Sequence, residues 1–176
     1  MNSFFKSFRL QVAFFFLFFA ASSIFSSCGV YTFRDVSIDY SKYKTIKVDF
    51  IENRASYKNP QLSAKVTDAL KQKISNQTKL TTINNDDANY RVSGYISSYS
   101  VSTSGISSQQ AATNRLTVGA HITLMDNVTN KPQDFDVSRD FDFAAGLTLT
   151  QAESQLLPDI IKNLTDEIFN RMFSNW

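Results

Sequence analysis

Three segments in the second half of the chain alternate apolar and polar residues with a period of two. They are YRVSGYISSYSV at 90–101, LTVGAHITLM at 116–125 and DFDVSRDFDF at 134–143. This period is typical of strands that bury one face and expose the other. Because the three segments are neighbours in the sequence, they are expected to pair as antiparallel hairpins. A sheet with one apolar face needs a covering layer, and this requirement constrains the whole fold.

Two amphipathic helices are predicted to supply that layer. After Pro60, apolar residues recur every three or four positions. Near the C-terminus, Thr150 and Glu153 have the spacing of a capping box, and Pro158 predicts a kink or a restart. The two apolar stripes are Leu62, Val66, Ala69, Leu70 and Ile74, and Leu157, Ile160, Ile161, Leu164, Ile168 and Met172.

Two further strands are expected before the main run. TIKVDFI at 45–51 places Ile46, Val48 and Phe50 on one face, and KLTTI at 79–83 fits a short strand. The resulting order is β-α-β-β-β-β-α. We therefore predict an α+β fold, in which two amphipathic helices pack on one face of a mixed, largely antiparallel sheet of four to five strands.

Two connections between the strands are rich in polar residues. The segment from Ser102 to Thr113 contains Ser, Thr and Gln with Gly105, so we expect an exposed, mobile loop. Residues 126–133 form a tighter turn with Pro132 at its exit.

The N-terminus has the pattern of a bacterial lipoprotein signal. Lys6 and Arg9 precede a run of about 16 mostly apolar residues, shorter than the roughly 20 that a membrane-spanning helix needs. Cys28, the only cysteine, follows two serines and precedes a glycine, as in a lipobox, although Phe25 stands where leucine is preferred. Acylation of Cys28 is the favoured prediction. An uncleaved anchor and a buried or free thiol are the alternatives.

This interpretation divides the chain into a signal peptide at 1–27, a lipid-proximal tether at 28–43 and one α+β domain at 44–176. Without Lys6 and Arg9, the mature chain has equal numbers of basic and acidic residues. Such a balance argues against nucleic acid as a partner. The lipobox places the protein in the bacterial envelope.

The sequence contains no pattern that predicts catalysis, a cofactor or a metal. His121 lies on a polar strand face and is expected to be structural or solvated. The four aspartates near the C-terminal strand predict a solvated acidic face, because their spacing of about 7 Å is too wide for one ion. Arg139 shares a row with apolar residues and is expected to be paired inside the fold. The aspartates are Asp134, Asp136, Asp140 and Asp142.

Several phrases resemble the lipopolysaccharide-assembly lipoprotein family LptE. The mature N-terminus reads CGVYTFRD, and longer phrases around Asn53 and Arg54, around Asn114 and Arg115, and at the C-terminus carry most of the similarity. The resemblance covers essentially the whole mature chain. These phrases are FIENRASYKNPQLSAKVTDALKQK, AATNRLTV and IFNRMFSNW.

The resemblance implies a non-enzymatic, lipid-anchored protein on the periplasmic face of the outer membrane. Such a protein plugs the LptD barrel, helps it to assemble and assists lipopolysaccharide delivery. Polar loops at the strand ends are the expected contacts, with the basic groups facing phosphates. A lipoprotein of another envelope machine and an envelope enzyme are the alternatives. For the two bases, the alternative role is solvation or a surface ion pair. The candidate contacts are Arg115, Lys131, Ser104, Gln109 and Asn127.

Overall fold

The computed structural model describes residues 38–107 and 110–173. No helix within these ranges is both long enough and apolar enough to span a bilayer. The elements are β1 (Thr45–Val48), β2 (Glu52–Asn53), α2 (Leu62–Gln77), β3 (Thr81–Thr82), β4 (Tyr90–Ser107), β5 (Gln110–Asp126), β6 (Lys131–Ala144) and α3 (Leu149–Phe173).

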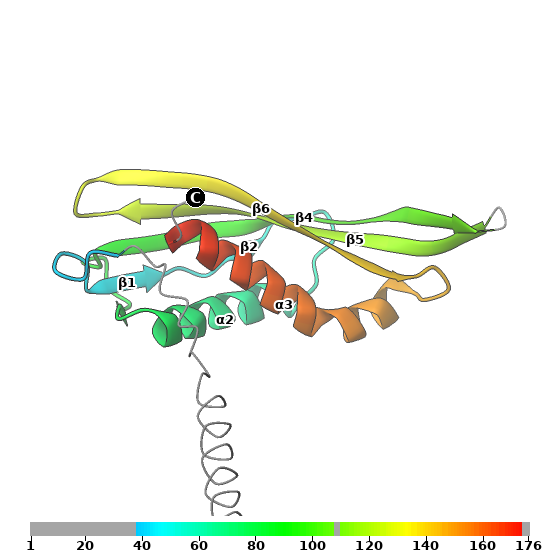
Figure 1. The fold of residues 1–176 in the computed structure, drawn as a ribbon, viewed down its shortest axis with the longest axis horizontal. Coiled ribbons are helices and arrows are strands. Elements are labelled where there is room, and N and C mark those ends of the chain that lie inside the picture. Colours follow the sequence, from blue (N-terminus) through cyan, green and yellow to red (C-terminus); the bar gives the residue numbers. More distant parts are fainter. Residues whose placement is uncertain (1–37, 108–109, 174–176) are drawn as a thin grey trace, which may run out of the picture. The chain divides into compact units, whose positions relative to one another are not determined.

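The strands form one mixed sheet in the order β3-β1-β4-β5-β6, and β2 also pairs with β4. The long strands β4, β5 and β6 are antiparallel, whereas β1, β2 and β3 make only parallel pairs. Both helices lie on the same side of this sheet (Figure 1). The predicted fold class is confirmed. The sheet has six strands, more than expected. The additional strand is β2, which follows β1 in the chain and pairs separately with β4.

The mobile loop predicted between Ser102 and Thr113 is wrong. The ladder between β4 and β5 continues through Ser102↔Arg115 to Ser107↔Gln110. Side chains from 100 to 104 are exposed on both faces, so apolar-polar alternation disappears although the backbone stays paired. Backbone pairing does not require an apolar face, and the periodicity could not reveal it.

The expected position of Phe50 on the buried face is also wrong. Ile46 and Val48 are buried, but Phe50 is 58% exposed and Ile51 is fully buried. Val48 pairs with Val92 and Glu52 with Tyr95, so the first strand advances by one more residue than β4. One extra residue reverses the alternation of side chains and places Ile51 in the core.

Helix α3 differs from the prediction in two ways. Its cap is Thr148, two residues before the expected Thr150. Thr148 and Gln151 form the capping box: the side chain of each accepts a hydrogen bond from the backbone N–H of the other, at 3.3 and 3.0 Å. The helix also runs through Pro158 without a restart. Ser154 and Pro158 are exposed, so water can reach the carbonyl that proline leaves without an intrahelical donor.

The core lies between the helices and the covered face of the sheet. Two ion pairs lie at the margin of the core. Lys73 of α2 contacts Asp166 of α3 at 2.8 Å, and Arg139 of β6 contacts Glu167 of α3. The internal partner predicted for Arg139 is therefore present. The fully buried side chains include Leu62, Val66, Leu70, Ile74, Leu116, Ile122, Ile160, Leu164 and Ile168, whereas Leu157 and Ile161 are half-buried.

Candidate functional site

The predicted contact residues lie at two opposite ends of the sheet. Ser104 and Arg115 are near the β4–β5 hairpin tip, whereas Asn127 and Lys131 are at the β5–β6 turn. Arg115 and Asp126 are both on β5, and the strand between them is about 36 Å long at ~3.3 Å per residue. These residues therefore form two separate surfaces. Gln109 and Cys28 lie outside the described residues.

At the hairpin end, Arg115 is held by acidic neighbours. Its Nε and Nη2 atoms donate to the two carboxylate oxygens of Asp142 at 2.7 and 3.0 Å, and Asp140 lies 3.8 Å away. The hydrogen bonds from Arg115 hold the pKa of the Asp142 carboxyl below its usual value. Any phosphate that approaches Arg115 must compete with this pair. The exposed Ser104 hydroxyl donates to the Thr113 carbonyl at 3.3 Å.

At the turn end, Asn127 and Lys131 have different roles. The Asn127 side-chain amide donates to the Ala88 carbonyl at 2.7 Å and so fastens the turn to the segment before β4. Lys131 is exposed, and within residues 38–107 and 110–173 no carboxylate forms an ion pair with it. Lys131 is therefore the more accessible cation of the two predicted phosphate contacts.

The uncovered face of the sheet carries a row of polar cross-strand pairs. Thr117 and Thr123 donate to Asp140 and Asp134 at 2.7 and 2.6 Å, and His121 Nδ1 lies 2.9 Å from Asp136. The four aspartates are exposed, as expected, and His121 contacts one of them on the same face.

A cluster of planar side chains on this face was not predicted from the sequence. The Arg54 guanidinium lies 4.5 Å from the centre of the Tyr95 ring, which lies 5.3 Å from the His121 ring. They border an open hollow of about 430 Å³, together with the exposed Phe50. The hollow joins residues from β2, β4 and β5, so the separate sequence segments contained no signal for it.

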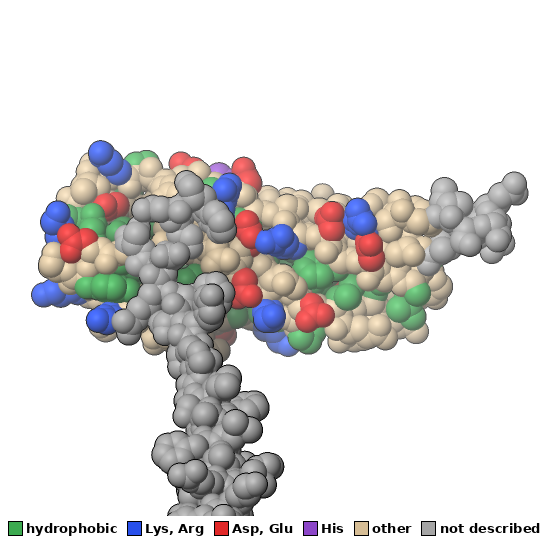
Figure 2. All heavy atoms as spheres, viewed as in Figure 1, with side chains coloured by type: hydrophobic (Ala, Val, Ile, Leu, Met, Phe, Trp, Pro, Cys, Tyr) green, Lys and Arg blue, Asp and Glu red, His purple; other side chains and the backbone are tan. Residues whose placement is uncertain are grey.

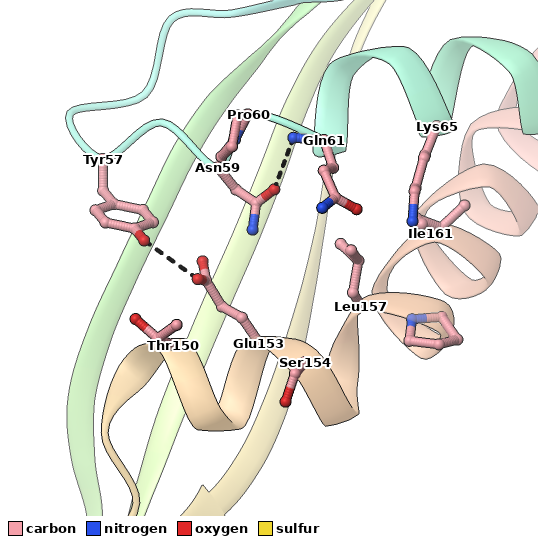
Figure 3. A pocket seen from close by; sticks show the side chains of 11 residues that line it. Tyr57, Asn59, Pro60, Gln61, Lys65, Thr150, Glu153, Ser154, Leu157 and Ile161 are labelled. Atoms are coloured by element: carbon pink, nitrogen blue, oxygen red, sulfur yellow. Dashed lines mark hydrogen bonds between the residues drawn. The ribbon is translucent and has the colours of Figure 1, made fainter.

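The second unforeseen feature is Glu153, which is buried at the base of a groove between the helices. Its two carboxylate oxygens accept hydrogen bonds from the hydroxyls of Tyr57 and Tyr99 at 3.1 and 2.5 Å. Burial and the bond to Glu153 raise the pKa of both phenols. Figure 3 shows Glu153 pointing from α3 toward Tyr57. The groove has a volume of about 670 Å³ and is bordered by Leu157 and Lys65.

A glutamate within an apolar stripe was the available sequence signal for this cluster. Glu153 lies one helical turn before Leu157, and a charge at such a position needs a partner. Both carboxylate oxygens are engaged by phenols, which suits a structural acceptor. Elsewhere in the described chain, no three His, Cys, Asp or Glu residues are placed to hold a metal ion.

The fold and these surfaces define a class: an α+β domain with helices on one sheet face and a polar face left uncovered. The sequence model of LptE, described as lipopolysaccharide-assembly, matches residues 43–172. The chain belongs to this family. No curated protein matches it by sequence.

Solved structures that are similar to this chain have little sequence in common with it. The hypothetical protein CT253 from Chlamydia trachomatis is 12% identical, with a TM-score of 0.51, over 73% of this chain and 95% of that one. Protein XCC0632 from Xanthomonas campestris is 11% identical, with a TM-score of 0.51, over 74% and 84%. A minor lipoprotein from Acinetobacter baumannii is 18% identical, with a TM-score of 0.47, over 74% and 92%.

Proposed function

We propose that this LptE family member is a non-enzymatic lipoprotein of the outer membrane. It is anchored through acylated Cys28 on the periplasmic face, occupies the lumen of the lipopolysaccharide translocon barrel and helps that barrel to assemble. It also assists delivery of lipopolysaccharide to the outer leaflet. The family match over residues 43–172 is the observation that carries this proposal. The division into a signal peptide (1–27), a tether (28–43) and a domain (44–176) is part of it.

The uncovered sheet face supports a position inside a water-filled barrel. Its side chains include hydroxyls, carboxylates, the guanidinium groups of Arg54 and Arg115 and the rings of Tyr95 and His121, and several of them make cross-strand contacts. Wide barrels have polar interiors, so such a face can remain hydrated or bond to the wall. A non-enzymatic role also agrees with Glu153, whose carboxylate is used by two phenols.

The position of Ile38 supports one orientation of the domain relative to the membrane. Ile38 and Lys131 border the same hollow at the turn end of the sheet. The ten residues from Cys28 to Ser37 span at most about 35 Å when fully extended. In this proposal the turn end is therefore the end nearer the anchoring membrane, and the hairpin end with Arg115 lies farther along the barrel axis.

Copurification and crosslinking in living cells test the proposal. The full-length lipoprotein is extracted in mild detergent, and its partners are identified by mass spectrometry. Photoreactive residues at Ser104 and Asn127 then probe the two ends, and Gln109 and Lys131 provide second positions. Adducts with one large barrel protein from both ends are expected. Adducts only with soluble proteins, or a different envelope machine in the pull-down, would contradict the proposal.

A further inference from the structure

The edge of β4 that faces away from β5 is paired up to Ile96 and is open beyond it in the described part of the chain. Up to that point, β1 and β2 pair with β4 along Tyr90–Val92 and Tyr95–Ile96. The strand continues to Ser107. Among residues 38–107 and 110–173, no strand pairs with this edge beyond Ile96, and only β5 pairs with the continuing strand.

The backbone groups that face this edge can be assigned from the pairing. The Val92 and Ile96 carbonyls accept hydrogen bonds from the Asp49 and Arg54 N–H groups at 2.8 and 2.9 Å, so they point outward. Alternate residues of a strand face the same neighbour, and the irregularity between Ile96 and Ser98 shifts that alternation by one residue. The outward groups beyond it belong to Tyr99, Val101 and Thr103.

This edge lacks the residues with which proteins usually prevent strand addition. Long open edges normally carry charges, proline or bulges. The other long edge, β6, has Pro132 and six charged residues within Lys131–Ala144. By contrast, β4 has no charged residue and no proline from Val92 to Ser107. Its pairing with β5 is irregular between Ile96 and Ser98 and again after Thr103, and these two irregularities leave the segment from Ser98 to Thr103 regular. Figure 2 shows no blue or red side chain on the part of the molecule next to the grey hairpin tip in this view.

The side chains beside the edge suggest the pattern of the strand that would fit it. Val101 is 43% exposed, and Tyr57, whose ring centre lies 5.3 Å from that of Tyr99, is 41% exposed. Both lie on the helix side of the edge. On the opposite face, Ser100 and Ser102 are exposed hydroxyls. An added strand would therefore present apolar residues on one face and polar residues on the other, as barrel strands do.

We propose that the β4 edge from Tyr99 to Thr103 binds an extended, uncharged segment of the barrel partner by strand addition. The inference rests on the proposed function. A second copy of this chain fits less well, because the open edge from Ser97 to Ser107 is only about 33 Å long at ~3.3 Å per residue. One such edge covers little of the roughly 800 Å² per partner that stable interfaces bury. A barrel that encloses the domain supplies the remaining contacts.

Amide hydrogen exchange of the full-length lipoprotein tests the pairing directly. The exchange of the Tyr99, Val101 and Thr103 amides is compared between the free chain and the copurified barrel complex. At least tenfold slower exchange at these amides in the complex is expected. The amides of Val118 and Ala120 on β5, which is paired on both sides, serve as the reference. Unchanged exchange at the three β4 amides in an intact complex would overturn the inference.

A matched pair of variants tests the same edge by copurification. Val101→Pro removes one outward N–H, whereas Val101→Thr keeps it in a β-branched residue of similar size. Val101→Pro should reduce barrel recovery about tenfold, with Val101→Thr close to wild type. Equal recovery for both would overturn the edge inference, whereas no barrel with wild type would overturn the proposed function. The oligomeric state of the free chain tests the occupant. If the wild-type chain is dimeric and the Val101→Pro chain is monomeric, the edge binds a second copy and the proposed occupant is wrong.

Discussion

The Tyr99 hydroxyl on β4 donates a 2.5 Å hydrogen bond to Glu153 Oε1 on α3, across 54 residues of sequence. Tyr57 binds the other carboxylate oxygen of Glu153 at 3.1 Å. Through this carboxylate, the first turns of α3 are connected to β4 and to the segment before α2. The same Tyr99 lies on the open part of the β4 edge, just beyond the last residue that pairs with β2.

Replacement of the Glu153 carboxylate should destabilise the domain. Glu153→Gln substitutes an amide for an acceptor of two phenol hydrogens, and the expected loss is about 1–3 kcal/mol in the free energy of unfolding. Chemical denaturation measures it. Glu167→Gln, at the more exposed pair with Arg139, is the matched control and should change the free energy of unfolding by less than about 1 kcal/mol. Equal effects of the two substitutions would contradict the assigned role of Glu153.

Alkaline pH should weaken the domain through Tyr99. Burial and the bond to Glu153 raise the folded-state pKa of this phenol above its usual value of 10.0. A raised folded-state pKa means that the stabilisation is complete below about pH 10 and is lost as pH rises further. Thermal melts above pH 10 should show this loss, and Tyr99→Phe should make the decline less steep. The same slope in Tyr99→Phe would exclude this phenol as the cause.

The capping residue of α3 can be tested with two neighbouring threonines. Thr148→Ala should cost about 1 kcal/mol in the free energy of unfolding, because it removes an N-cap that exchanges bonds with Gln151. Thr150→Ala, inside the first turn, should change that free energy by less than about 0.5 kcal/mol. A larger loss for Thr150→Ala than for Thr148→Ala would indicate that Thr150 is the cap, as expected from the sequence.

The apolar contact between the helices should dominate stability. Leu70→Ala and Leu164→Ala each remove a fully buried side chain and should cost about 2–5 kcal/mol. Lys162→Ala, at an exposed position of α3, serves as the control. Denaturant titration compares the three variants. An unchanged thermal midpoint for either leucine variant would indicate that these stripes are partner surfaces.

If Arg115 contacts lipopolysaccharide, its ion pair with Asp142 must be replaced by an ion pair with a phosphate group. Asp142→Asn should then strengthen lipopolysaccharide binding, and Arg115→Gln should weaken it roughly fivefold, equivalent to about 1 kcal/mol. Lys131→Gln tests the other end of the sheet independently. Titration of the purified lipoprotein with labelled lipopolysaccharide measures the three affinities. Unchanged binding in all three variants would leave both bases with solvation or surface pairing as their role.

Several elements could be predicted because their signals are local. The stripe Leu62–Val66–Leu70–Ile74 and the alternation in LTVGAHITLM each reflect the period of one element. The burial of Ile51 in place of Phe50 was not predicted, because the extra residue before β2 is visible only in the register against β4. The paired end of the β4–β5 hairpin was missed for a related reason, since hydroxyl-rich strands pair through the backbone without a periodic signal.

The amino-acid sequence by itself determined the two helices, the main strands and the family, because periodicity and family phrases are properties of contiguous residues. Only the tertiary structure decided that Arg115 is paired and Lys131 lies at the opposite end of the sheet. It also decided that Glu153 meets two phenols and that β4 keeps an open edge. These features depend on register and packing between distant segments, which no local pattern encodes.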